Sequence, residues 1–290
     1  MKEKTIAGLN IASLGLKSRV LIFFSILIGL GVTLYGKPLY ALSGAVLQRQ
    51  GSSHGLFVPF IFAYLIWLKL DKIKGIRPQM ALLPGVAMVA GGGILFMLGQ
   101  SREGFSFPVL SFLLVAGGLI LVLFGTEVFK QVAFPVFFLA AMIPLHQGVD
   151  TWIADRMAQS STWGAVRLAK LMGVSLFREG LDIYLPDTHL YIAHGCSGIR
   201  YLLSYLVFGL AYAFRFKQST AGRSLVLIGA VPLSIVGGML RLTIIFTSAY
   251  YIGPIMVEHR PHVLLSWSVF TFLLVTVIAV DRYVSKKKVN

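Results

Sequence analysis

Charged residues and cysteine are both scarce in this chain of 290 residues. Asp, Glu, Lys and Arg together make up 13% of the chain, about half the share of an average soluble domain. With 57% hydrophobic residues and a mean hydropathy of +0.81, this composition excludes an ordinary soluble domain and predicts an integral membrane protein. The single cysteine, Cys196, excludes an internal disulfide, so any thiol chemistry must use that residue.

Acidic residues are fewer than basic ones, 11 against 26, which gives a net charge of +15. A nucleic-acid binder is excluded because no soluble basic domain is present to carry it. Basic loops that fix the orientation of membrane helices explain the excess.

The hydropathy pattern predicts an all-α polytopic membrane protein with about eight transmembrane helices in one membrane domain, residues 1–290. A span needs about 20 apolar residues, so the second and fifth runs are short for one. The runs cover residues 20–35, 56–68, 80–98, 107–124, 132–145, 199–214, 225–251 and 263–280.

The distribution of charge predicts that both termini are cytoplasmic. If the N-terminus is inside, 16 of the 26 Lys and Arg lie in inside loops and ends, which then carry a net +12, against +3 for the rest. With both termini on the same side, the number of spans is expected to be even.

Residues 146–198 are too polar to span and predict an extracytoplasmic cap. The first half, DTWIADRMAQSSTWGAVRLAKLMGV, has apolar residues in helical steps and indicates one or two amphipathic helices. The second half places β-branched and aromatic residues around Pro186 and Asp187, which indicates a short β-hairpin. A plain connector is the alternative.

Cys196 lies in HGCSGIR, between two glycines and at the outer end of the sixth span. A lone cysteine in this place is usually an inert small hydrophobe. Two features favour a nucleophile: Gly195 and Gly198 allow a substrate to approach closely, and a helix start favours a thiolate.

Arg241 interrupts the seventh span, where an arginine costs about 2.5–3.5 kcal/mol on insertion scales and is a functional candidate by default. It lies 16 residues beyond Leu225, about 24 Å at 1.5 Å per residue. This places it in the outer third of the membrane, at the level of Cys196. Snorkelling or a structural pairing is the alternative.

His259 and His262 precede the eighth span, and Pro261 suits the first turn of that helix. A thiol, a guanidinium and an imidazole therefore meet at the outer ends of spans six to eight. These groups suffice for acyl transfer: the thiolate attacks, the imidazole transfers the proton, and the cation stabilises the oxyanion. The predicted catalytic core is residues 196–262.

No metal and no cofactor is predicted. His194, Cys196, His259 and His262 could be drawn together as a zinc set, but their spacing matches no zinc motif.

The segment GVSLFREGLDIYLPDTHLYIAHGCSGIRYLLSYLVFGLAYA, residues 173–213, resembles the exosortase/archaeosortase family of membrane sorting enzymes. The family shows a similar REG lead-in, an LP turn and CSGIR. It then has an arginine in the next-to-last span, here in GGMLRLTII, and a histidine before the last span, here in HVLLSW. The resemblance is close over the C-terminal half, while the five N-terminal spans match only in hydropathy.

Residue by residue, the resemblance places the family's catalytic cysteine, arginine and histidine on Cys196, Arg241 and His262. The histidine assignment rests on the serine-tryptophan pair that follows it by four and five positions. Family members often carry an asparagine three residues before the arginine, where this chain has Gly238.

The resemblance implies a cofactor-free cysteine protease or transpeptidase of the plasma (inner) membrane that acts at the extracytoplasmic, periplasmic face. Its substrates would be exported proteins with a C-terminal sorting tail of the PEP-CTERM type: a short Pro-containing motif, a transmembrane helix and a basic cluster. Cleavage would pass through a thioester on Cys196, with His262 as general acid and base and Arg241 as oxyanion stabiliser. His194, Ser197 and Arg200 are candidates to contact the substrate.

Three rival functions stay open from the residues alone. Arg241 could line the anion path of a transporter or channel. A membrane acyltransferase would share the thiol but act on a lipid. A serine protease built on Ser197 or Ser204 is the weakest, because neither serine has a clearly closer histidine than Cys196 has.

Overall fold

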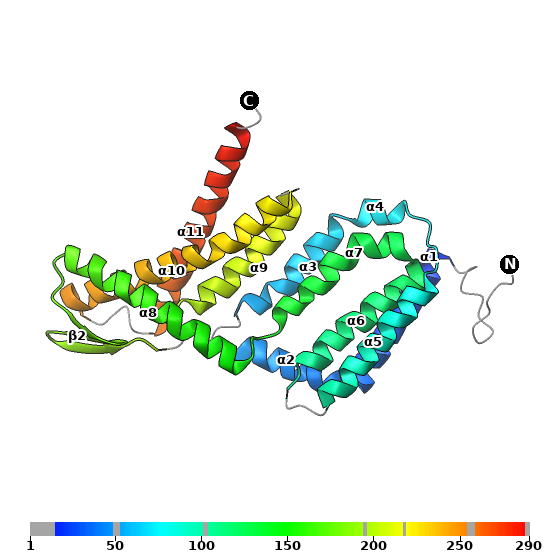
Figure 1. The fold of residues 1–290 in the computed structure, drawn as a ribbon, viewed down its shortest axis with the longest axis horizontal. Coiled ribbons are helices and arrows are strands. Elements are labelled where there is room, and N and C mark those ends of the chain that lie inside the picture. Colours follow the sequence, from blue (N-terminus) through cyan, green and yellow to red (C-terminus); the bar gives the residue numbers. More distant parts are fainter. Residues whose placement is uncertain are drawn as a thin grey trace. The chain divides into compact units, whose positions relative to one another are not determined.

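The computed structural model describes residues 15–48, 53–100, 104–193, 196–216, 219–253 and 259–287, which are mostly helical (Figure 1). The chain divides into two compact units, Met1–Pro144 and Leu145–Asn290. Among the described residues, six helices are long and apolar enough to cross a membrane. The protein is therefore a multi-pass membrane protein. These helices are α1 (Leu16–Thr33), α5 (Leu82–Gln100), α6 (Ser106–Phe124), α9 (Ile199–Phe216), α10 (Thr220–Tyr251) and α11 (His259–Lys287).

All eight predicted apolar runs are helical, but two of them form shorter helices than the prediction of eight full spans requires. Residues 56–68 form α3 (Val58–Trp67), which follows the short helix η2 (Ser53–Leu56). Residues 132–145 fall on α7 (Thr126–Phe138) and η3 (Leu139–Met142), and Pro135 lies inside α7. The sequence reading missed two further helices, α2 (Gly36–Gln48) and α4 (Leu70–Lys74).

The first unit is organised around the antiparallel pair α5 and α6, which pack closely because glycines occupy their contact face. Gly85, Gly92 and Gly99 recur every seven residues on α5 and are all buried. A Cβ added at Gly92 would lie 2.8 Å from Cγ2 of Val115, so only glycine permits this approach. Small residues at the interface are how membrane helices come close together.

The second unit begins with the predicted cap, which has one more strand than the sequence indicated. A single helix, α8 (Gln147–Leu171), forms its first part, in agreement with the predicted one or two helices. The predicted hairpin around Pro186 and Asp187 is confirmed as the antiparallel pair β2 (Asp182–Leu185) and β3 (Thr188–Tyr191). A third strand, β1 (Phe177–Glu179), pairs with β2, so the sheet order is β1-β2-β3.

The cap packs onto the C-terminal part of α10 through an apolar cluster, so it is an ordered part of this unit. Ile183 of the sheet and Phe246 of α10 are fully buried there, together with Ala165 and Ala169 of α8. Burying apolar area at about 25 cal/mol per Å² makes such a cluster a main source of stability for the cap. Figure 1 shows the sheet beside α8 and the end of α10.

A second apolar cluster joins α8, α9, α10 and α11. Tyr201 and Tyr205 of α9 stack on Phe270 of α11, with ring centroids 6.2 Å and 4.8 Å apart. The two tyrosine hydroxyls also donate to backbone carbonyls of α11, those of Ser266 at 3.0 Å and Phe270 at 3.3 Å. These contacts hold the first half of α11 against α9.

Candidate active site

Cys196 lies in the short segment that leads into α9, three residues before that helix begins. Its N–H donates to the carbonyl of Ala193 at 2.8 Å. Gly198 has φ +90°, a left-handed conformation that L side chains rarely adopt, so the glycine of CSG is needed to turn the chain into the helix. The thiol is half-buried.

Arg241 is one of the largest fully enclosed side chains in the described chain, with 2% of its surface exposed. Its Nη2 donates to the backbone carbonyl of Cys196 at 2.5 Å, and its Nη1 donates to Oγ of Ser266 at 3.4 Å. The guanidinium also lies over the ring of Tyr201, 5.4 Å from the centroid. These contacts account for a charge inside the helical bundle, where an unpaired cation would be very costly.

His262 lies in the first turn of α11, where the sequence placed it. Its Nε2 is 3.6 Å from Sγ of Cys196, which is hydrogen-bonding distance for sulfur. Its carbonyl accepts a hydrogen bond from Oγ of Ser266 at 2.8 Å, four residues along the helix. The imidazole therefore faces the thiol directly.

The structure thus brings together Cys196, Arg241 and His262. Along the chain, Arg241 is 45 residues and His262 is 66 residues from the cysteine. A thiol beside an imidazole is the arrangement that makes cysteine a nucleophile, because the ring can accept the thiol proton. A buried cation next to the same loop can stabilise negative charge on a bound carbonyl oxygen. This arrangement is suited to acyl transfer at a peptide carbonyl.

The sequence reading missed two residues that hold Arg241 in place. Ser266 receives one arm of the guanidinium and donates to the carbonyl of His262, so it links the two groups. Tyr201 lies under the guanidinium and bonds α11. The signal for Ser266 was present, because a residue four positions after His262 lies on the same helix face.

The three candidate substrate contacts have different positions. Ser197 is fully buried, and its Oγ accepts the N–H of Ile199 at 3.3 Å, as a helix-capping group does. Arg200 is half-buried in the first turn of α9. His194 and the side chain of His259 lie outside the described residues.

Gly238, where family members often have asparagine, is the point at which the cap helix meets α10. A Cβ added there would lie 2.5 Å from Oγ of Ser161 on α8 and 3.0 Å from its Cβ. Oγ of Ser161 in turn donates to the carbonyl of Ile235 at 3.4 Å. Glycine at this position lets α8 approach α10 beside the loop of Gly198.

We expect the substitution Gly238→Ala to lower the free energy of unfolding by about 1–3 kcal/mol, because the added methyl overlaps Ser161. Gly229→Ala is the matched control on the same helix, since a Cβ there meets nothing within 4 Å. Thermal unfolding in detergent measures both. Adding Ser161→Gly should restore most of the lost stability, and a failure to do so would contradict the overlap as the cause.

Among the residues that the structure describes, no group of three or more His, Cys, Asp or Glu is placed to hold a metal ion. The acyl-transfer arrangement uses none.

The fold and the cluster define a class: a multi-pass membrane protein that carries a thiol, an imidazole and a guanidinium together in its C-terminal half. The family model described as "Transmembrane exosortase (Exosortase_EpsH)" matches residues 46–279. The chain therefore belongs to the transmembrane exosortase family, as the resemblance around CSGIR indicated, and membership implies the processing of sorting signals. No curated protein and no solved structure matches the chain.

Proposed function

We propose that the protein is a membrane-embedded cysteine protease or transpeptidase that cleaves the C-terminal sorting tails of exported proteins. The observation that carries the proposal is the contact of 3.6 Å between Sγ of Cys196 and Nε2 of His262, beside the buried guanidinium of Arg241. Family membership supports the substrate class, and the geometry supports the roles given to the three residues.

In the proposed reaction the thiol proton passes to His262 while Sγ of Cys196 attacks the scissile carbonyl. Arg241 holds the cysteine loop through its carbonyl, and its positive charge stabilises the oxyanion that forms close by. The carbon–nitrogen bond breaks, the tail leaves with the proton returned by His262, and the exported protein stays as a thioester on Cys196. An amine or water then attacks the thioester and frees the thiol.

The proposal puts the site at the extracytoplasmic face, with both termini inside and the two short helices α3 and α7 as the second and fifth of eight spans. The charge asymmetry supports this orientation. Arg223 lies 18 residues before Arg241 on α10, so the basic end of this unit is about 27 Å from Arg241 along the helix.

The geometry favours the thiol over the rival functions. Ser197 is fully buried and bonds the start of α9, whereas Cys196 is the residue that faces His262. Arg241 is 2% exposed and bonds the loop of Cys196, so its position beside the thiol is poorly suited to an open anion path. A lipid acyltransferase would use the same thiol but take its acyl group from a lipid. A test with a tailed protein as substrate therefore distinguishes the two functions.

The decisive experiment co-expresses the protein with an exported protein that carries a Pro-containing tail and follows C-terminal trimming by mass spectrometry. Hydroxylamine added to the reaction should convert the thioester into a hydroxamate at the new C-terminus. A trimmed product in membranes that lack the enzyme, or acyl transfer from lipid alone, would overturn the proposed function.

We expect His262→Asn to lower the trimming rate by about 10²-fold, the low end for loss of a general base. A thiol keeps more nucleophilicity without a base than a hydroxyl does, so the loss should be incomplete. His189→Asn is the control, because its imidazole bonds Asp182 in the cap sheet. Equal rates in the His262 variant and the wild type would remove the imidazole from the mechanism.

A further inference from the structure

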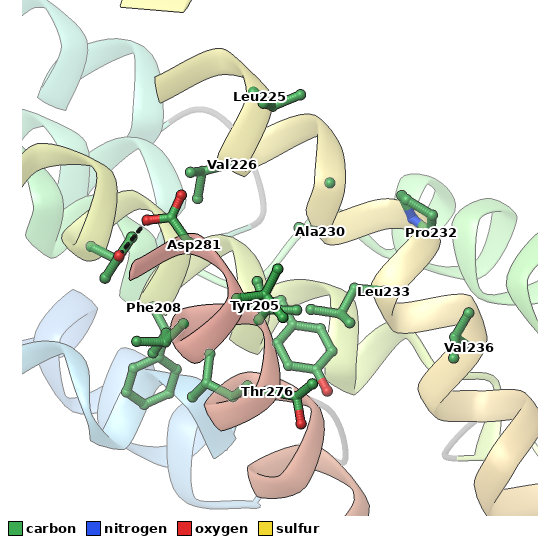
Figure 2. A pocket seen from close by; sticks show the side chains of 17 residues that line it. Tyr205, Phe208, Leu225, Val226, Ala230, Pro232, Leu233, Val236, Thr276 and Asp281 are labelled. Carbon is green, nitrogen blue, oxygen red and sulfur yellow. Dashed lines mark hydrogen bonds between the residues drawn. The ribbon is translucent and has the colours of Figure 1, made fainter. Parts of the chain in front are cut away.

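A cavity of about 760 Å³ opens between α9, α10 and α11, in the half of the second unit away from Cys196. Figure 2 shows Leu225 and Val226 of α10 toward one end of the groove and Val236 toward the other, with Tyr205 and Phe208 of α9 between them. The side chains of this groove are almost entirely apolar. The polar groups at its edge are engaged: the Tyr212 hydroxyl donates to Asp281 at 2.6 Å, a bond drawn dashed in Figure 2.

The groove lies between two places where α11 is joined to α9. Stacking of Tyr201 and Tyr205 on Phe270 fixes the first half of α11, and the hydrogen bond from Tyr212 to Asp281 joins its second half to α9. All of the lining lies on helices long and apolar enough to span a membrane. An apolar groove on such helices is chemically suited to a lipid acyl chain.

Three arginines gather where the groove ends. The guanidinium groups of Arg215 and Arg282 lie over the same ring, that of Phe216, at 5.0 Å and 5.4 Å from its centroid. Arg223 lies over Phe214 at 5.9 Å. With the single carboxylate of Asp281 held by Tyr212, this end of the unit carries an excess of positive charge.

We propose that the groove binds one anionic phospholipid, with an acyl chain between α9, α10 and α11 and the phosphate at Arg215, Arg223 and Arg282. Basic groups between membrane helices on one leaflet are the chemistry that selects anionic headgroups. The apolar groove and the three arginines are independent observations. A single phospholipid would account for both, because its acyl chain suits the groove and its phosphate suits the arginines.

The dimensions fit an acyl chain. From Leu225 to Val236 the groove follows 11 residues of α10, about 16 Å, which is half of the roughly 30 Å hydrocarbon thickness and so the depth of one leaflet. A helix about 10 Å wide fills roughly 400 Å³ per turn. The cavity of 760 Å³ would hold fewer than two turns over a length that needs three, so a substrate helix or a second copy fits it less well.

The test uses the full-length protein, purified in detergent with equal palmitoyl-oleoyl phosphatidylglycerol and phosphatidylcholine, and counts retained lipids by native mass spectrometry. The wild type should retain one phosphatidylglycerol in preference to phosphatidylcholine. Replacing Arg215, Arg223 and Arg282 together by Ala should reduce this preference by about 100-fold, at roughly fivefold for each charge. Arg167→Ala is the matched control, because that guanidinium stacks on Trp163 in the cap at 3.6 Å.

A second variant tests the groove itself. Gly229 lines it and has nothing within 4 Å of an added Cβ, so Gly229→Leu should fill the groove without disturbing the helix and abolish lipid retention. Gly91→Leu is the control, at an equally open glycine of α5.

Three results would overturn the proposal. One is equal retention of the two phospholipids by the wild type. Another is unchanged lipid retention in Gly229→Leu, which would mean that the retained lipid does not have an acyl chain in the groove. The third is a photo-crosslinker at Leu225 that captures a polypeptide, a second copy or a substrate tail, rather than a phospholipid.

Discussion

Replacing Cys196 by Ala is expected to lower the trimming of tailed exported proteins by about 10⁴-fold or more, because the substitution removes the nucleophile on which every later step depends. The loop should keep its conformation, since Arg241 bonds the backbone carbonyl of residue 196, which alanine retains. The measurement is the fraction of substrate with a truncated C-terminus at equal enzyme levels. Cys196→Ser should recover little, because a hydroxyl is a far weaker nucleophile beside the same imidazole.

Thermal unfolding of the Cys196 variants provides the control, and it should stay within the small range typical of a half-buried side chain. Undiminished trimming by Cys196→Ala would remove the cysteine mechanism altogether. Solute transport that survives the substitution, in the absence of trimming, would instead favour the transporter alternative.

Arg241→Lys should lower the trimming rate by about 10²–10³-fold, the loss typical of removing an oxyanion-stabilising group. The planar guanidinium bonds the carbonyl of Cys196 and the hydroxyl of Ser266 at once. A lysine ammonium is a compact charge on a flexible stem and cannot reproduce that fork. The positive charge stays, so this change isolates geometry from charge.

Arg19 offers a matched control for burial. It is 4% exposed and donates from Nη1 to the carbonyl of Leu123 at 2.6 Å, but it lies in the first unit. Arg19→Lys should affect thermal stability and leave the trimming rate of the folded protein unchanged. A rate within threefold of wild type for Arg241→Lys would show that charge alone is sufficient, and full activity of Arg241→Gln would exclude the cation from the reaction.

Hydropathy predicted the helices well because lipid requires every backbone group to bond within its own helix. It missed α2, whose residues Gly36–Gln48 mix apolar and polar residues in a way that carries no clear span signal. The third strand of the cap was also missed. Phe177–Glu179 is too short for a period of two residues to stand out, and its pairing with β2 depends on the turn at Gly180, with φ +61°.

The three residues of the site were predictable because each is chemically out of place in an apolar span or at its end. What holds them was not. Tyr201 and Ser266 are ordinary residues of membrane helices, and their contacts with Arg241 depend on how α9, α10 and α11 pack. Gly238 is a similar case, since its meaning depends on Ser161, 77 positions away.

The tilt of α11 sets the distance between the reactive groups, because α11 carries His262 while Cys196 and Arg241 belong to its neighbours. Phe270, stacked on Tyr205, lies eight residues from His262, about 12 Å along the axis. A tilt of roughly 10° about that point would move the imidazole by about 2 Å, enough to break its contact of 3.6 Å with the thiol. The hydrogen bonds from Tyr201 to the carbonyl of Ser266 and from Tyr212 to Asp281, one on each side of Phe270, oppose such a tilt. Spin labels on the two ends of α11 should therefore report narrow distributions of distance to α9.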